Sequence, residues 1–133
     1  MGKKNIILGF FVIMFLLSIG SVSAVDYYVN GSNGNNANNG SDWNNAFETI
    51  GEGIRRMSSE DTLIIADGVY DATQDNLVRN IPNGTSNQYT TIMAQNDHKA
   101  IINGTLLSSG GVVSISDSSY IQLIGLGSRD TPH

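Results

Sequence analysis

The sequence predicts an all-β protein, built as a parallel β-helix of about three coils that begins with a capping α-helix. Turn-forming residues are abundant, with 15 Gly and 15 Asn against two Pro, as many short strands require. Predicted strands begin at Thr62, Thr90 and Val112, and these spacings of 28 and 22 residues are typical of a solenoid. In a solenoid each coil buries its apolar face against the next. A β-sandwich is the main alternative, although it would show clearer hairpin spacing.

Composition limits the classes of function. A chain of 133 residues is long enough for one domain. It contains no cysteine, which excludes a disulfide framework and thiolate metal sites. Twelve acidic residues outnumber seven basic ones, giving a net charge of −5, and this balance argues against a nucleic-acid partner.

Residues 1–24 have the order of a secretory signal peptide. Two lysines precede an apolar run over 6–19, and small side chains at Val22 and Ala24 suit a signal peptidase. Cleavage after Ala24 would leave a secreted or cell-surface protein. The alternative is an uncleaved anchor over 6–22, which is 17 residues long and at the lower limit of about 17–25 for a membrane span. Only in that case would the protein have a membrane partner.

The rest of the chain divides into three parts. Residues 25–61 hold a first strand, an Asn- and Gly-rich loop and the capping helix; residues 62–126 hold the coils; residues 127–133 form a C-terminal tail. The loop covers 30–40, where nine of eleven residues are Asn or Gly. The alternation of β-formers and turn residues predicts strands at 26–29, 62–66, 69–70, 89–94, 100–102, 112–116 and 120–124.

The capping helix is predicted over 49–57, because apolar residues at 47, 50, 54 and 57 recur on one helical face. Thr49 and Glu52 form a predicted capping box, in which the carboxylate reaches back to the Thr49 amide. Gly51 and Gly53 each weaken the helix by about 1 kcal/mol relative to Ala. We therefore expect packing, close over a sheet or helix end, to hold the helix in place.

A long motif runs through the capping region into the first coil. It reads Gly40-Ser41-x-Trp43-x-x-Ala46-Phe47-x-Thr49-Ile50-x-x-Gly53-Ile54, followed by Asp61-Thr62-Leu63-x-Ile65-x-x-Gly68-x-Tyr70. This motif resembles the N-terminal capping region of secreted right-handed parallel β-helix proteins of the pectate-lyase-like superfamily. Pectate lyases of polysaccharide lyase family nine and adhesin-like surface proteins carry similar openings. The resemblance extends over about residues 26–126.

The resemblance implies that the helix plugs the open end of the coil stack, with Trp43 and Phe47 packed there. Two departures suggest a less stable cap. The family usually has Gly where this chain has Glu60, and Ala within the helix where this chain has Gly51 and Gly53.

The resemblance also sets expectations about activity. In the lyases, which continue for many more coils, an Asp cluster holds calcium and a Lys or Arg abstracts the proton alpha to the uronate carboxylate. Neither motif is matched here, so no catalytic residue carries over, no cofactor is expected in this chain, and calcium is expected only in full-length lyase relatives. We expect a non-catalytic N-terminal fragment related to polysaccharide-acting proteins, with a polysaccharide or cell-wall glycan as partner. The alternative is an adhesin-like or structural cell-surface β-helix.

Two sets of residues are candidates for other chemistry. Asp67, Asp71 and Asp75 recur every four residues and could supply part of a calcium site, although the Asp-x-Asp-x-Asp-Gly calcium loop is absent. Sequons for N-glycosylation begin at Asn30, Asn39, Asn83 and Asn103, and each is also an Asn-Gly turn.

Aromatic side chains could stack on sugar rings in a binding module. Those available are Tyr27, Tyr28, Trp43, Tyr70, Tyr89 and Tyr120. Because most lie at predicted strand ends or in the cap, packing is the favoured role for them.

Overall fold

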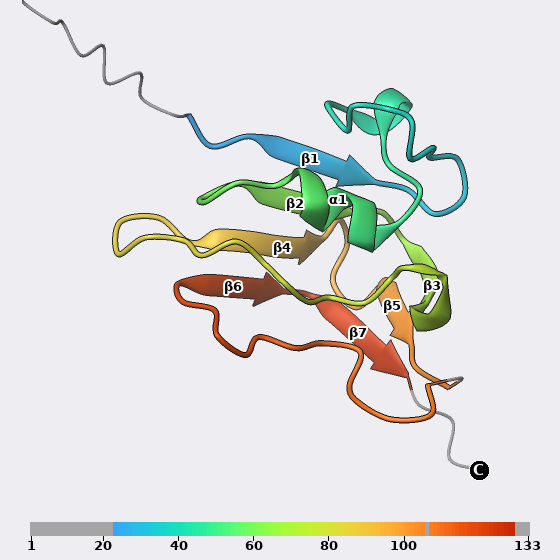
Figure 1. Cartoon of the computed structure of the whole chain (residues 1–133). Coiled ribbons are helices and arrows are strands. Elements are labelled where there is room, and N and C mark those ends of the chain that lie inside the picture. Colours follow the sequence, from blue (N-terminus) through green and yellow to red (C-terminus); the bar gives the residue numbers. More distant parts are fainter. Residues whose placement is uncertain (1–22, 106, 130–133) are drawn as a thin grey trace, which may run out of the picture.

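The computed structural model describes residues 23–105 and 107–129 (Figure 1). The predicted signal peptide therefore lies almost entirely outside the described residues, as does the end of the predicted tail. Within the described part of the chain, no helix is long and apolar enough to cross a membrane.

The described residues form two parallel sheets, which confirms the all-β class. The first sheet has the order β1 (Asp26–Val29), β2 (Thr62–Ile65), β4 (Thr90–Ala94) and β6 (Ile121–Ile124). The second has the order β3 (Gly68–Asp71), β5 (Ala100–Asn103) and β7 (Leu126–Arg129). From β2 onward the chain alternates between the sheets, so each passage adds one strand to each of them (Figure 1).

The register of the first sheet corrects the predicted repeat. Thr62 pairs with Thr91, and Thr91 pairs with Gln122. Equivalent positions on successive strands of this sheet are therefore 29 and then 31 residues apart in the sequence. The predicted strand at 112–116 is wrong, because Val113 makes only an isolated parallel bridge to Val78. The strand that follows β2 and β4 in the first sheet is β6, not the segment at 112–116. Two glycines precede Val112 and weaken a strand there, so this segment is held at one point rather than along a ladder.

Strand β7 occupies part of the predicted tail. Its sequence, Leu-Gly-Ser-Arg, has little β propensity, but it pairs with β5 along its whole length. Pairing with an existing strand overrides the weak local preference.

The capping helix α1 (Ile50–Arg56) begins after Thr49, as predicted, and the Thr49 hydroxyl accepts the Glu52 amide at 3.3 Å. The second half of the predicted capping box is wrong. The Thr49 amide donates to Asn36 Oδ1 at 3.0 Å, while the Glu52 carboxylate binds Arg55 and Arg56. The Asn-rich loop thus supplies the acceptor that Glu52 was expected to provide.

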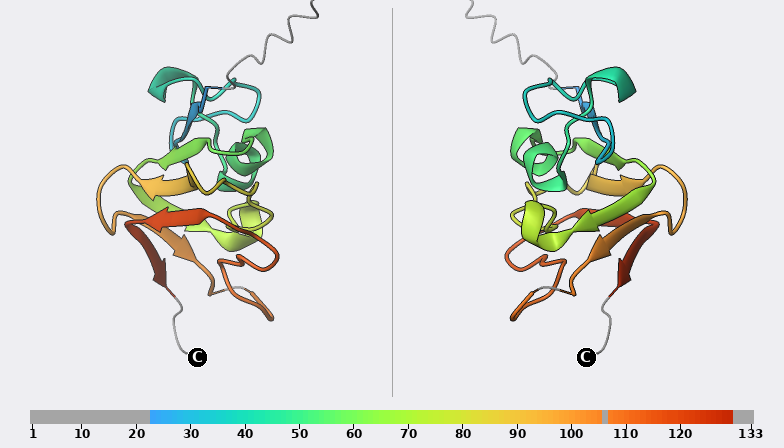
Figure 2. Two further views of the ribbon diagram at one scale, coloured as in Figure 1. Left: turned by 90° about the vertical axis from the view of Figure 1, so that its left-hand side faces the viewer. Right: turned by 90° about the vertical axis from the view of Figure 1, so that its right-hand side faces the viewer.

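The start of α1 is docked on the segment that follows the 3₁₀ turn η2 (Ala72–Gln74) (Figure 2). The Ile50 amide donates to the buried Asn76 side chain at 2.9 Å, and the Gly51 amide donates to the Asp75 carbonyl at 2.8 Å. These bonds satisfy amides that the helix itself leaves without partners. The expectation that packing holds this glycine-containing helix is confirmed, because Ile50, Gly53 and Ile54 are buried.

The core lies between the two sheets and under α1. Leu63 and Ile92 occupy one inward column of the first sheet, and Ala100 and Ile102 belong to β5 of the second. Phe47 pairs with Val29 through an isolated bridge and closes the core beside β1. The same cluster draws on α1, on β1 to β5 and on the segments that connect them, but on neither β6 nor β7: Val29, Phe47, Ile50, Ile54, Met57, Leu63, Ile65, Tyr70, Ala72, Val78, Ile81, Ile92, Ala94, Ala100 and Ile102.

Candidate functional site

The three candidate calcium ligands are directed to different partners. The Asp67 carboxylate accepts from the side-chain nitrogen Nδ2 of Asn96 at 3.1 Å, and the Asp71 carboxylate accepts from Nδ2 of Asn103 at 2.8 Å. Asp75 binds Arg55 instead. Within residues 23–105 and 107–129, no three acidic, His or Cys side chains lie close enough together to hold a metal ion.

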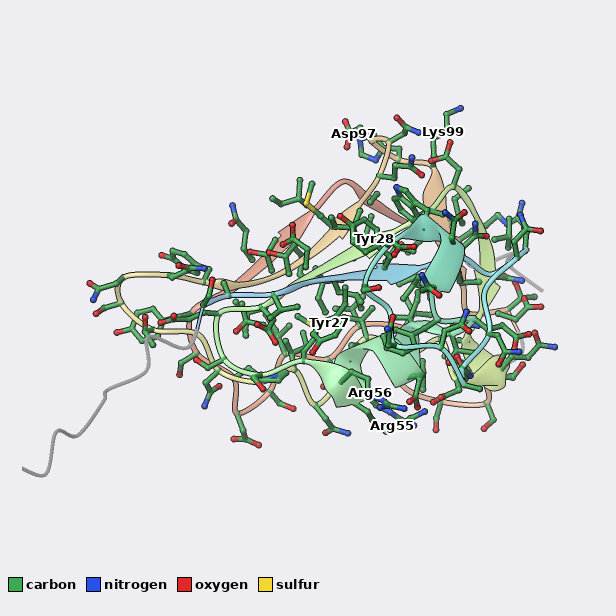
Figure 3. All side chains as sticks on the ribbon, turned by 90° about the horizontal axis from the view of Figure 1, so that it is seen from above. Tyr27, Tyr28, Arg55, Arg56, Asp97 and Lys99 are labelled. Carbon is green, nitrogen blue, oxygen red and sulfur yellow. The ribbon has the colours of Figure 1, made fainter. Side chains whose placement is uncertain are left out.

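Asp75 belongs to an ion-pair network that fastens α1 to the segment after η2. Arg55 donates to Asp75 Oδ2 at 2.7 Å and to Glu52 Oε2 at 2.9 Å, and Arg56 donates to Glu52 Oε1 at 2.7 Å. Figure 3 shows both arginines on α1, on the side of the molecule away from Asp97 and Lys99. The hydrogen bond from Arg56 is the main cause of the lowered pKa of Glu52, and the bond from Arg55 lowers the pKa of Asp75. Glu52, Arg55 and Asp75, which we call the clasp, hold α1 in place and have a structural role.

The aromatic candidates divide into packed and exposed groups. Tyr70 is buried; its hydroxyl donates to the Ala66 carbonyl at 2.9 Å, and burial raises its pKa. Tyr27 packs on Phe47, and Tyr28 meets Trp43 edge to face with ring centroids 4.8 Å apart. The prediction that aromatic residues serve in packing is confirmed for these.

Tyr89 and Tyr120 are the exception. Their exposed fractions are 51% and 48%, and their rings meet edge to face at 6.2 Å between centroids. We call this pair the tyrosine platform. It is large enough to present aromatic surface to a ligand, and the edge-to-face contact holds the two rings relative to each other.

The register of the first sheet places the tyrosine platform. Tyr89 directly precedes β4 and Tyr120 directly precedes β6, and the first residues of these strands, Thr90 and Ile121, are paired. The Thr90 amide donates to the Tyr120 carbonyl at 3.0 Å. Tyr120 also has a φ of 56°, a left-handed conformation that is costly for a bulky residue and that marks functional sites more often than other positions.

Amide side chains adjoin the platform through neighbouring residues of the backbone. Asn83 Oδ1 accepts the amide of Ser119, the residue before Tyr120, at 2.8 Å. Gln88, the residue before Tyr89, donates through Nε2 to the Glu60 carbonyl at 3.2 Å. Asn83, Asn87 and Gln88 are all exposed. Aromatic faces beside amide donors and acceptors can stack on a sugar ring and hydrogen-bond its hydroxyl groups.

The sequence contains a signal for this pairing that the prediction missed. Tyr89-Thr90 and Tyr120-Ile121 are equivalent positions of two successive strands, 31 residues apart. The prediction places the start of the third strand at Val112 and therefore does not align the two tyrosines.

The described residues also form clefts. One beside α1, of about 180 Å³, is lined by Gly51, Ile54, Arg55, Asp75, Leu77, Arg79 and Asn80, and its Arg55 and Asp75 are paired with each other. Two others lie elsewhere on the surface. One, of about 270 Å³, is lined by Gly31, Glu48, Thr49, Val69, Tyr70, Asp71, Gln74 and Asn76. Its lining holds two carboxylates and no basic side chain of the kind that abstracts a proton in the lyases. The other cleft, of about 230 Å³, lies at the β6–β7 end and is lined by apolar and small residues that include Ile102, Val113, Leu123 and Leu126.

Comparison with known proteins leaves the family of the chain open. No protein-family model matches the sequence, and no curated protein is significantly similar to it.

Proposed function

We propose that this chain is the capped start of a secreted or cell-surface right-handed parallel β-helix, and that its tyrosine platform binds a polysaccharide or cell-wall glycan without catalysing a reaction. The observation that carries the binding function is the exposed, paired arrangement of Tyr89 and Tyr120 among amide side chains. The resemblance to pectate-lyase-like proteins supports the same class of ligand.

Three features support the architecture. Strands alternate between two parallel sheets, α1 covers the β1 end, and parallel crossover connections are almost always right-handed. The signal-like residues 1–24 support export.

The net charge bears on the kind of glycan. A chain with a net charge of −5 repels a polyuronate more than a neutral polysaccharide. We therefore expect retention on neutral cell-wall glycans to exceed retention on polygalacturonate, and added salt to narrow the difference.

The test is retention of the purified protein on a panel of immobilised neutral and acidic glycans. Tyr89→Ala and Tyr120→Ala should each weaken binding on the order of tenfold, equivalent to about 1.4 kcal/mol. Val69→Ala is the matched control, because Val69 is an exposed apolar residue on the other sheet. Circular dichroism verifies that each variant is folded. Unchanged binding by both tyrosine variants, or no retention of the wild type on any glycan, would contradict the proposal, and release of unsaturated uronate product would contradict its non-catalytic part.

An adhesin-like or structural β-helix is the second candidate, and the β6–β7 end favours it. Leu123 and Ile124 are partly exposed there beside the apolar cleft. Exposed strand edges of this kind pair readily with further strands. Light scattering at increasing protein concentration distinguishes the two functions, because assembly that survives both tyrosine substitutions would favour the structural role.

A further inference from the structure

The four sequons differ in how the folded chain presents them. Transfer of a glycan requires that the Asn amide nitrogen be reachable and that the hydroxyl two residues later be accessible to the transferase. The structure describes all four Asn residues and their Ser or Thr partners, so the four can be compared on burial and hydrogen bonding.

Asn103 is the least accessible acceptor. It is half-buried, its amide nitrogen donates to Asp71 at 2.8 Å, and its oxygen accepts from the Thr105 hydroxyl at 2.6 Å. Both groups that a transferase must engage are therefore occupied by other residues of the fold.

The sequons that begin at Asn30 and Asn83 each have one residue that is poorly accessible to the transferase. Asn30 is half-buried at the end of β1, and its oxygen accepts two loop amides. Asn83 is exposed, but the hydroxyl of its partner Thr85 is half-buried and donates to Glu60.

Asn39 is the sequon in which both members are exposed. Asn39 Oδ1 accepts the Ser41 amide at 3.0 Å, and the Ser41 hydroxyl donates to the exposed carboxylate of Asp42 at 3.1 Å. Within the described residues, Asn39 Nδ2 donates no hydrogen bond. A glycan on Nδ2 leaves the Asn39 oxygen free to keep accepting from Ser41, so the turn survives modification.

We propose that Asn39 is the N-glycan acceptor of the folded protein. The donor is a lipid-linked oligosaccharide of the polyprenyl phosphate or diphosphate class. Asn39 Nδ2 forms a bond to the anomeric carbon, the bond from that carbon to the phosphate oxygen breaks, and the oxygen leaves with the electron pair while Nδ2 loses one proton to the transferase. Glycosylation of Asn39 in the cell requires the export proposed above, whereas the accessibility of Asn39 in the folded protein does not depend on it.

The test uses purified folded protein, a lipid-linked donor and an oligosaccharyltransferase selected because it modifies a short peptide of each of the four sequons. Intact mass and peptide mapping should show one glycan, located on Asn39. Asn39→Gln should lose nearly all of this modification, whereas Asn103→Gln, the matched control, should keep it. Unfolding the protein in denaturant before the reaction should make Asn103 an acceptor as well.

Modification of folded protein at Asn103 before Asn39 would overturn the proposal, and so would an unmodified Asn39 in folded protein. Because the reaction is carried out on purified protein, a failure of export or of glycan binding by the tyrosine platform leaves its result unaffected.

Discussion

The two ends of the strand stack contain similar residues but differ in how their edges are covered. At the β1 end, the Tyr28 amide donates to the Gly40 carbonyl at 2.9 Å and the Asn30 amide donates to the Phe47 carbonyl at 2.8 Å. The loop and the residues before α1 thus pair the outer edge of β1. At the other end of the first sheet, no strand or loop bond of this kind is found on the outer edge of β6 within the described residues, and in the second sheet the outer edges of β3 and β7 both lack a partner strand there. Closure of this fold is therefore provided by irregular segments, not by the sheets themselves.

Three paired residues on the inward face of the first sheet show how burial changes from one end of the sheet to the other. Leu63, Ile92 and Leu123 are paired in register, and their exposed fractions are 0%, 0% and 37%. Leu63 and Leu123 are the same residue type in the same column. The difference in burial arises from the neighbouring strand on the far side, as expected for a repeat structure in which each layer buries the next.

The largest predicted effect compares these two leucines. Leu63→Ala should lower the free energy of unfolding by about 2–5 kcal/mol, because it opens a cavity in a fully buried site. Leu123→Ala should cost less than about 1 kcal/mol, because much of that side chain is already in water. Urea denaturation of both variants measures the difference. Equal losses would mean that the β6 end is covered in solution and would contradict the comparison.

A glycine in α1 provides the second test. A Cβ at Gly53 would lie 2.6 Å from Leu63 Cδ1 and 2.9 Å from Val29 Cγ2, so the helix can approach β1 and β2 only without a side chain there. Gly53→Ala should destabilise the protein by about 1–3 kcal/mol in spite of its better helix propensity.

The matched control for Gly53 is Gly127 in β7, where a Cβ would meet its nearest atom, Ile101 Cγ1, at 3.4 Å. Gly127→Ala should change the midpoint of thermal unfolding little. A stabilised Gly53→Ala variant would show that the close contact between α1 and the sheet is not required.

The smallest predicted effect concerns the clasp of Glu52, Arg55 and Asp75. Both carboxyl pKa values are lowered in the folded protein, so their contribution to stability is present above the ordinary values of 4.5 and 3.8 and is lost as the pH falls through the lowered values. Because Arg55 and Asp75 are largely exposed, and Arg56 still pairs with the more covered Glu52, Arg55→Ala should cost less than about 1 kcal/mol at neutral pH.

Denaturation at neutral pH and in acid tests the clasp, since the wild type and Arg55→Ala should converge as the pH falls through the lowered pKa values of both carboxyl groups. A difference between them that grows on acidification would have the wrong sign.

The predictable part of the fold follows from strong local patterns. The strands near 62–65, 90–94 and 121–124 are rich in β-formers, and the helix has a clear apolar face. Strand β7 has no such pattern and depends on β5 for its formation. The tyrosine platform also depends on long-range pairing, because the register of β4 and β6 brings Tyr89 and Tyr120 side by side.

The two departures from the resembled family, at Glu60 and within α1, have physical explanations in the fold. Glu60 has a φ of 73°, which explains why glycine suits this position, and its backbone is held by Thr90 and Gln88. Gly51 and Gly53 weaken an isolated helix but allow α1 to approach Asp75 and Leu63. Propensity alone could not reveal this second effect, because it depends on residues distant in the sequence.

Amide hydrogen exchange at the two outer edges of the first sheet tests the difference between the ends most directly. The amides of Tyr28 and Asn30, which bond to Gly40 and Phe47, should exchange as slowly as those of β2 and β4. The amides of β6 that point away from β4 should exchange much faster. Equal protection at both edges, or stronger protection along β6 than along β1, would contradict a stack that is closed at one end and open at the other.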